Sequence, residues 1–461
     1  MDYEFFIKQK TANIPDAGFD TNVPKGSILF PFQAECVRWA WKRGRAALFA
    51  DTGLGKTGMQ LTWADGVHRV TGGKVLILGP LAVVRQTERE AGKFGIKGVR
   101  VVRKSSDAPD CPIHVTNYEN AKNMDLESYV GVVLDESSIL KNAQGRYRNW
   151  LIEVFSQTPY KLACSATPAP NDFTELGNHS EWLGAMDEAV MRARWFINDL
   201  SDTVAPWRLK GHAIDDFWRW VCTWSRCVSK PSDMGDFDDN AYDLPALRVE
   251  QHIVAVDITS SDGSGMLFRI PELSATSIHT EKRRTLPERI AKAKELVESF
   301  GAQPVIVWCE TNYEQDAIMA ALPNAIDVRG SMKPEHKADR LLHFSDEGGI
   351  IVTKPSIAGM GMNWQHCCNM VFVGASYSYE GFYQAVRRAW RFGQLLPVTA
   401  HVIMASTERQ IWQTIHRKSG QHKEMRKKML IASRLAARKY RASQDYHPNH
   451  VAQVPAWLKT Q

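Results

Sequence analysis

One stretch near the N-terminus, Ala50-Asp51-Thr52-Gly53-Leu54-Gly55-Lys56-Thr57, has the residue types and spacing to hold a phosphate group. It follows the apolar run 46–49 and precedes a segment of helical character that begins near Gly58. Glycines let backbone N–H groups approach phosphate oxygens without a Cβ in the way. In such a loop, Lys56 reaches the β- and γ-phosphates and the Thr57 hydroxyl ligates Mg²⁺. The alternative is a glycine turn that contains Lys-Thr by chance.

A pair of carboxylates, Asp135 and Glu136, ends the apolar run 130–134. Ligands of α/β proteins gather at the carboxyl ends of the strands. There, Asp135 can complete a Mg²⁺ shell, and Glu136 can orient or deprotonate an attacking water. The alternative for two acids at a strand end is a solvated turn.

Two other positions complete this candidate chemistry. Gln33 precedes the phosphate loop and can read an adenine edge, because an amide both donates and accepts; taken alone, a surface glutamine is the simpler interpretation. Arg388 and Arg391 lie on a predicted helix and are three residues apart, which places them on one face. They are candidate arginine fingers for the γ-phosphate, with an exposed basic face as the alternative.

The elements that must position these residues alternate between strand and helix, which predicts parallel sheets. A first unit is expected to contain strands at 74–80, 114–119, 130–136 and 160–164, and a second, starting near 285, strands at 304–309, 349–353 and 370–373. Between them, residues 177–245 are rich in Trp. These Trp side chains could stack nucleobases, but their helix-face spacing favours the aromatic core of a helical extension.

Length and composition agree with this organisation. A chain of 461 residues is too long for one ordinary core, and 44% hydrophobic with 23% charged residues is typical of soluble globular proteins. No apolar run has the length of a membrane span, and the first residues lack a signal-peptide pattern. The eight scattered cysteines predict reduced thiols. An intracellular, cytoplasmic protein without a membrane partner is therefore expected.

The positive charge is concentrated near the C-terminus. Residues 417–441 contain ten Lys/Arg and one acid, so this segment carries a charge of +9. The whole chain carries +6, so the remaining residues together carry about −3. Residues 420–441 are predicted to form one helix, with Lys423, Lys427 and Arg434 on its basic face and Met425 and Met429 on its apolar face. The hypothesis is that the apolar face docks on the second α/β unit and the basic face contacts DNA; a solvated charged face is the alternative.

Taken in order, these motifs resemble those of superfamily-two helicase-type ATPases, and within them the Swi/Snf-like branch of double-stranded DNA translocases. The resemblance covers about residues 29–420 and rests on seven segments: 29–33, 51–57, 135–142, 165–171 with 175–176, 244–245, 359–363 and 384–394. Ser138 stands where the family usually has His, which leaves open how the Asp-Glu box is linked to the coupling motif at 165–171. Without the long insertions of chromatin remodellers, the chain resembles compact bacterial or phage-encoded members.

This resemblance implies two tandem RecA-like parallel-sheet domains, with ATP and Mg²⁺ between them. The implied domains are a lead-in at 1–28, lobe one at 29–176, a helical, Trp-rich extension and connector at 177–284, lobe two at 285–420 and a basic C-terminal helix and tail at 421–461. The implied nucleotide contacts are Gln33, Thr52, Gly53, Leu54, Gly55, Lys56 and Thr57, with Thr57 and Asp135 on Mg²⁺ and with Lys56, Asp135, Glu136, Arg388 and Arg391 catalytic. Candidate phosphate-backbone contacts are Arg85, Thr116, Asn117, Tyr118, Ser331, Thr353 and Asn363.

The expected function is an ATP-dependent DNA translocase or helicase whose duplex-DNA grip is largely independent of sequence. Three alternatives stay open: an RNA helicase of the same superfamily, the motor subunit of a restriction or defence complex with a partner chain, and a catalytically dead nucleic-acid clamp. The closing Arg-x-x-Arg-x-Gly-Gln favours the DNA branch over the RNA helicases. The intact Lys56, Asp135 and Glu136 argue against the dead clamp.

Overall fold

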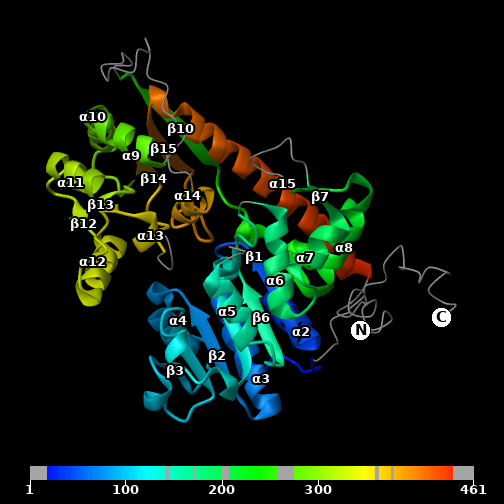
Figure 1. Cartoon of the computed structure of the whole chain (residues 1–461). Coiled ribbons are helices and arrows are strands. Elements are labelled where there is room, and N and C mark those ends of the chain that lie inside the picture. The colour runs from blue at the N-terminus through cyan, green and yellow to red at the C-terminus, as the bar shows by residue number, and fades with distance from the viewer. Residues whose placement is uncertain are drawn as a thin grey trace. The chain divides into compact units, whose positions relative to one another are not determined.

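The chain forms two compact α/β units, shown in a computed structural model (Figure 1). The structure describes residues 18–141, 145–170, 172–198, 207–256, 275–358, 363–374 and 378–439. Unit 1 comprises Met1–Asp239 and Gln421–Gln461, and unit 2 comprises Asn240–Gly420. Some predicted motif positions lie outside the described residues: Asn142, Asn171, the run 359–362 and the tail from residue 440.

A parallel sheet of seven described strands forms the centre of unit 1, in the order β3-β4-β2-β5-β6-β1-β9. Its strands are β1 (Arg45–Ala50), β2 (Lys74–Gly79), β3 (Val99–Val101), β4 (Ile113–Asn117), β5 (Tyr129–Asp135), β6 (Tyr160–Cys164) and β9 (Ser225–Val228). In the register of the sheet, Cys164 of β6 is the partner of both Leu48 in β1 and Asp135 in β5. The phosphate loop, the coupling motif and the Asp-Glu box therefore leave the same edge of the sheet from three adjacent strands.

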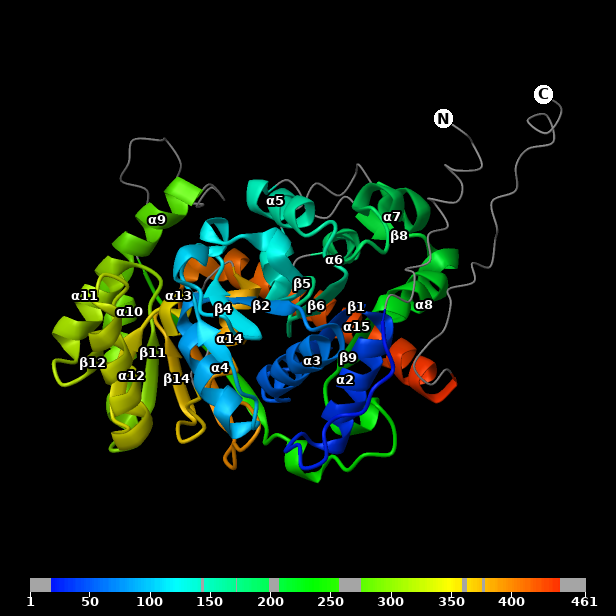
Figure 2. The same ribbon diagram turned by 90° about the horizontal axis from the view of Figure 1, so that it is seen from below.

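Helices connect the strands of unit 1, and Figure 2 shows α2 and α3 side by side. The helices are α2 (Pro31–Arg43), α3 (Lys56–Thr71), α4 (Leu81–Lys93), α5 (Arg146–Val154), α6 (Leu176–Leu183), α7 (Glu188–Trp195) and α8 (Ile214–Trp224), with a small antiparallel hairpin of β7 (Phe196–Asn198) and β8 (Trp207–Leu209). Apolar strands that alternate with amphipathic helices are typical of a parallel α/β unit, in which the helices pack on the sheet.

The tryptophans of the extension form an aromatic core, as the helix-face spacing predicts. Trp182, Trp195, Trp218, Trp220 and Trp224 are buried. The rings of Trp195 and Trp220 stack with centroids 4.6 Å apart. Since these five side chains are enclosed by the core of unit 1, they are not free to stack nucleobases.

Unit 2 contains a second parallel sheet of six described strands, in the order β10-β15-β14-β11-β13-β12. The strands are β10 (Leu247–Val254), β11 (Val305–Trp308), β12 (Ile326–Asp327), β13 (Ile350–Thr353), β14 (Asn369–Phe372) and β15 (Val398–Ala405), and the helices are α9 (Ala275–Arg284), α10 (Leu286–Ser299), α11 (Asn312–Ala321), α12 (Pro334–Glu347), α13 (Pro355–Ala358) and α14 (Tyr379–Val386). Figure 2 shows α10, α11 and α12 beside the strands of this sheet. Two parallel-sheet α/β domains in tandem, the predicted fold class, are confirmed.

Of the strands in the two sheets, the sequence analysis did not predict β3, β9, β10, β12 and β15. Two of these, β9 and β10, lie in the segment interpreted as extension and connector. β9 pairs with β1 and completes the first sheet. β10 pairs with β15 along all eight of its residues, so unit 2 begins at Asn240 rather than near 285. Both strands are short or largely exposed, and only their pairing with a distant strand defines them.

The basic helix differs from the expectation in both length and docking site. α15 runs from Arg409 to Lys439, so it begins eleven residues before the predicted start at 420. Met425 and Met429 are buried in the core of unit 1, in the same cluster as Trp224 and Cys227. The hypothesis that the apolar face docks on the second α/β unit is therefore wrong. Figure 1 shows the red end of α15 next to α8, and the Ser433 hydroxyl accepts a hydrogen bond from the Cys227 amide at 3.2 Å.

Candidate nucleotide site

The phosphate loop lies between β1 and α3, as predicted, although the helix begins at Lys56 rather than near Gly58. Gly55 caps this helix with φ at 75°, a left-handed conformation that glycine adopts without steric cost. A Cβ on Gly55 would lie 2.3 Å from Gln33 Nε2. The backbone angle therefore favours glycine as the second glycine of the loop, and any larger residue would also have to displace the Gln33 amide.

Gln33 is buried and supports the loop directly. Its Nε2 donates to the Leu54 carbonyl at 2.8 Å, and its Oε1 accepts from the Phe30 amide at 2.9 Å. The interpretation of Gln33 as a surface residue is therefore wrong. In this structure the amide joins the N-terminus of α2 to the phosphate loop.

Lys56 and Thr57 occupy the first two positions of α3, where the helix dipole favours an anion. The Lys56 ammonium donates to the carbonyls of Ala50 at 3.0 Å and Asp51 at 3.3 Å. Both acceptors are neutral, so an anionic phosphate oxygen offers the ammonium a stronger partner. Thr57 is half-buried.

The Asp-Glu box ends β5 at the same sheet edge. Gln60 of α3 donates from Nε2 to Asp135 Oδ1 at 2.7 Å, which joins the box to the phosphate-loop helix. Burial raises the pKa of Asp135, against the opposing effects of Gln60 and Lys56. Glu136 is the one non-glycine residue among those described with a positive φ, 54°. Such a backbone is strained and is often found at functional sites.

A buried histidine that the sequence analysis did not single out links the Asp-Glu box to the rest of unit 1. His179 of α6 lies with Nε2 3.0 Å from Ser137 Oγ, and Ser165 of the coupling motif donates from Oγ to Glu136 Oε2 at 3.5 Å. These contacts answer the question that Ser138 left open. The coupling motif reaches the box through Ser165, and His179 of α6 contacts the next residue of the box segment, Ser137. No local sequence signal marks His179, because it lies 42 positions from its partner.

The neutral state of His179 predicts a pH-dependent stability. Burial lowers the pKa of His179 to about 4, below the value of about 6.5 expected in the unfolded chain. The unfolded state therefore binds the extra proton first, and the stabilisation is complete above pH 6.5 and is lost as pH falls toward 4. We expect the free energy of unfolding to fall by up to about 1.4 kcal/mol per pH unit in this window. Urea titrations at several pH values check this for the wild type and for His179→Gln. If the free energy of unfolding fell equally steeply with pH in both proteins, the prediction would be contradicted.

The C-terminal helix contacts the phosphate loop through an ion pair. Arg426 Nη1 lies 3.0 Å from Asp51 Oδ2, and both side chains are largely buried. The second oxygen, Asp51 Oδ1, accepts from the Thr52 amide at 2.7 Å. The Asp51 amide donates to Val228 of β9 at 2.9 Å. The first residue of the loop is thus held by β9 and by α15, two elements distant from it in sequence.

Removing this arginine should destabilise unit 1 and loosen the loop. We expect Arg426→Ala to lower the free energy of unfolding by about 2–4 kcal/mol, because the Asp51 carboxylate then loses a buried cation, and to raise KM for ATP. Arg69→Ala is the matched control, since it removes an exposed Arg–Asp pair of similar length and should change little. Adding Asp51→Asn to Arg426→Ala should recover part of the stability. A loss no larger than that of Arg69→Ala would contradict this role.

The arginines of unit 2 do not share a helix face, which corrects the sequence analysis. α14 ends at Val386, and the residues that follow form successive turns. Arg388 is buried and donates from Nε to the Gln384 carbonyl at 3.1 Å, and Arg391 donates to Asn363 Oδ1. The turn forms because Trp364 donates its amide to the Arg388 carbonyl at 2.9 Å. The neighbouring Arg387 lies over the Trp390 ring at 4.9 Å.

The candidate nucleic-acid contacts divide into two groups. Thr116, Asn117, Tyr118 and Thr353 are buried; the Tyr118 hydroxyl donates to the Asp135 carbonyl at 2.6 Å and Thr353 Oγ1 to the Val328 carbonyl at 3.2 Å. Their side chains are enclosed in this structure, and a contact of these four residues with DNA stays a prediction. The other three, Arg85 on α4, Ser331 and Asn363, are exposed. They stay predictions.

Comparison with known proteins identifies part of the chain. Residues 288–393 match the family described as the helicase conserved C-terminal domain. Unit 2 contains a helicase C-terminal domain. The resemblance to helicase-type ATPases is thereby confirmed in this unit, and the matched segment includes Arg388 and Arg391 and ends at Gly393.

Beyond the helicase C-terminal domain, the comparisons give less. A solved structure of the Sulfolobus solfataricus SWI2/SNF2 ATPase core in complex with dsDNA is 16% identical, covers 94% of this chain and 99% of its own, and has a TM-score of 0.41. A similarity of that size carries no inference about function. No curated protein matches the chain significantly. Among the described helices, none has the length and apolar character needed to cross a membrane.

Proposed function

We propose that the chain is an ATP-dependent DNA translocase or helicase of the Swi/Snf-like branch of superfamily two. The observation that carries the proposal is the convergence of three motifs at one sheet edge of unit 1, joined by the Gln60–Asp135 and Ser165–Glu136 hydrogen bonds. The helicase C-terminal domain in unit 2 supports the same assignment.

The residues of unit 1 fit a magnesium nucleotide. Lys56 and the helix N-terminus would hold the phosphates, and Thr57 with Asp135 would supply the oxygen ligands that Mg²⁺ prefers. When bound, Mg²⁺ neutralises the charge that develops on the phosphoryl oxygens. Because burial raises the pKa of Asp135, a nearby cation would favour its charged form. Glu136 would orient the attacking water.

Arg388 and Arg391 of the helicase C-terminal domain are proposed to stabilise the transferred phosphoryl group, as the resemblance implies. Both are held by contacts within unit 2, to Gln384 and Asn363. If ATP binds the two units more tightly in one arrangement than in another, hydrolysis can drive a cycle between them. Phosphate-backbone contacts suit such a motor, because they give affinity without sequence choice.

Duplex DNA is the proposed substrate, on the resemblance of Arg388-x-x-Arg391-x-Gly393-Gln394 to the closing motif of the DNA-translocating branch. The deciding measurement is ATP hydrolysis by the purified chain with no nucleic acid, with single-stranded DNA, with duplex DNA and with RNA. We expect duplex DNA to stimulate turnover most strongly. Stimulation by RNA alone would assign the chain to the RNA helicases. No stimulation despite intact ATP binding would point to a motor that needs a partner chain.

A further inference from the structure

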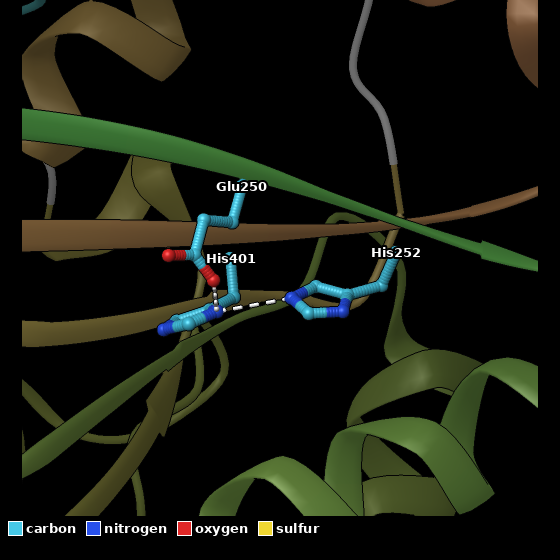
Figure 3. Close-up of side chains that lie close together, drawn as sticks. All are labelled: Glu250, His252 and His401. Carbon is cyan, nitrogen blue, oxygen red and sulfur yellow. Dashed lines mark hydrogen bonds and ion pairs between the residues drawn. The ribbon is translucent and has the colours of Figure 1, made fainter.

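Three side chains that the nucleotide site does not use meet between the edge strand of the second sheet and its neighbour. Glu250 and His252 are two residues apart on β10, so they lie on the same face of the strand. His401 on β15 is the register partner of Glu250. Figure 3 shows the carboxylate and both imidazoles close together, with dashed lines that join His401 to each of the other two residues.

The distances within this cluster are short. His252 Nε2 lies 3.0 Å from His401 Nδ1, and Glu250 Oε2 lies 3.3 Å from the same His401 nitrogen. One ligand atom from each residue lies within 4.8 Å of the other two. Ligand atoms placed about 2.0–2.2 Å from a tetrahedral zinc ion lie about 3.3–3.6 Å from one another. The observed separations therefore need only small side-chain rotations to accept an ion.

The chemistry of the three donors is specific for one class of cation. Two imidazole nitrogens and one carboxylate oxygen form a mixed set that suits Zn²⁺ and related first-row ions, whereas Mg²⁺ and Ca²⁺ prefer oxygen alone. Among the described residues, this is the group of three or more His, Cys, Asp or Glu side chains whose ligand atoms lie close enough together to hold a metal ion. We propose that Glu250, His252 and His401 of the second unit bind one divalent first-row metal ion such as Zn²⁺.

The surroundings are consistent with a site that is held on one side and open on the other. His401 is almost fully buried and packs against Phe300, with ring centroids 5.3 Å apart. Half of the Glu250 side chain is exposed, so an ion can enter and a water can fill a fourth position. The rigid imidazole on the inner strand and the accessible carboxylate on the edge strand form a preorganised set of donors.

An ion at this position would tie the edge strand to the sheet. β10 pairs only with β15 among the described strands, and His252 and His401 are 149 positions apart in the sequence. A link between residues so distant restricts the unfolded chain and stabilises the folded state. The site is therefore expected to be structural, and it is independent of the nucleotide site in unit 1.

The proposal is tested by calorimetric titration of Zn²⁺ into the full chain after removal of metals with a chelator. We expect one ion per chain, and a loss of affinity of at least tenfold in both His252→Gln and Glu250→Gln. These two residues are chosen because buried His401 is more sensitive to substitution. His343→Gln, which changes an exposed histidine of the same unit, is the matched control and should bind as the wild type does.

Two further readouts separate this site from binding by cysteine thiols. Co²⁺ at a nitrogen and oxygen site should give visible bands without the intense thiolate-to-cobalt absorption, and Zn²⁺ should raise the Tm of the wild type but not of His252→Gln. Unchanged affinity in His252→Gln, a thiolate spectrum, or no saturable binding to a folded wild type would each overturn the proposal. Circular dichroism of each variant shows whether a loss reflects unfolding instead, in which case Glu250→Gln, at a half-exposed position, decides.

Discussion

Replacing Lys56 with alanine should reduce the nucleic-acid-stimulated rate of ATP hydrolysis by about 10²–10³-fold. The magnitude follows from the loss of one preorganised positive group in a site where negative charge develops. The ammonium lies at the N-terminus of α3 and bonds neutral carbonyls 3.0 and 3.3 Å away. A bound phosphate can therefore recruit it without breaking an ion pair. Glu136→Gln should have an effect of similar size, because it keeps the shape of the side chain and removes the base.

The measurement is steady-state phosphate release with saturating ATP and duplex DNA. Lys74→Ala is the matched control, since it removes another unit 1 lysine whose ammonium pairs with the exposed Asp110. ATP binding measured separately distinguishes a lost nucleotide site from lost turnover: Glu136→Gln should bind ATP and fail to hydrolyse it. Near-normal turnover in either variant would overturn the assignment of the site.

Met425→Ala should lower the free energy of unfolding of unit 1 by about 2–5 kcal/mol. This side chain is 0% exposed within the core cluster that includes Trp224 and Cys227. Truncating a buried methionine costs both the transfer free energy and the cavity left behind. Leu435→Ala is the matched control on the same helix, because Leu435 is 62% exposed and its truncation should change stability by less than about 0.5 kcal/mol.

Urea unfolding followed by tryptophan fluorescence measures both variants, since the aromatic core of unit 1 surrounds the site. Equal stability of Met425→Ala and Leu435→Ala would show that α15 does not pack there. The same packing changes how DNA contact by the helix is tested. Truncation after residue 420 would remove part of the core, so the salt dependence of DNA binding is better measured in Lys423→Ala and Lys427→Ala, whose side chains are exposed. Arg434 is less suited to that test because it pairs with Asp233.

Local sequence determined the fold class and the candidate nucleotide residues. Apolar runs, glycines and strand-end carboxylates are local signals, and each strand they predicted in the two sheets is present. The adjacency of the phosphate loop and the Asp-Glu box was also predictable in outline, because carboxyl ends of parallel strands meet at one edge.

Only the tertiary structure decided which distant residues support those motifs. His179 reaches Ser137, Arg426 reaches Asp51, and His401 meets Glu250 across gaps in the sequence that no periodicity spans. The helical face predicted for Arg388 and Arg391 is absent, since the backbone forms turns after Val386 and the Arg388 carbonyl accepts a hydrogen bond from the Trp364 amide. α15 packs on unit 1 because Met425 and Met429 are buried in the hydrophobic core of that unit. An amphipathic pattern states that an apolar face must be buried, whereas its partner is chosen by the shape of surfaces that exist only once the chain has folded.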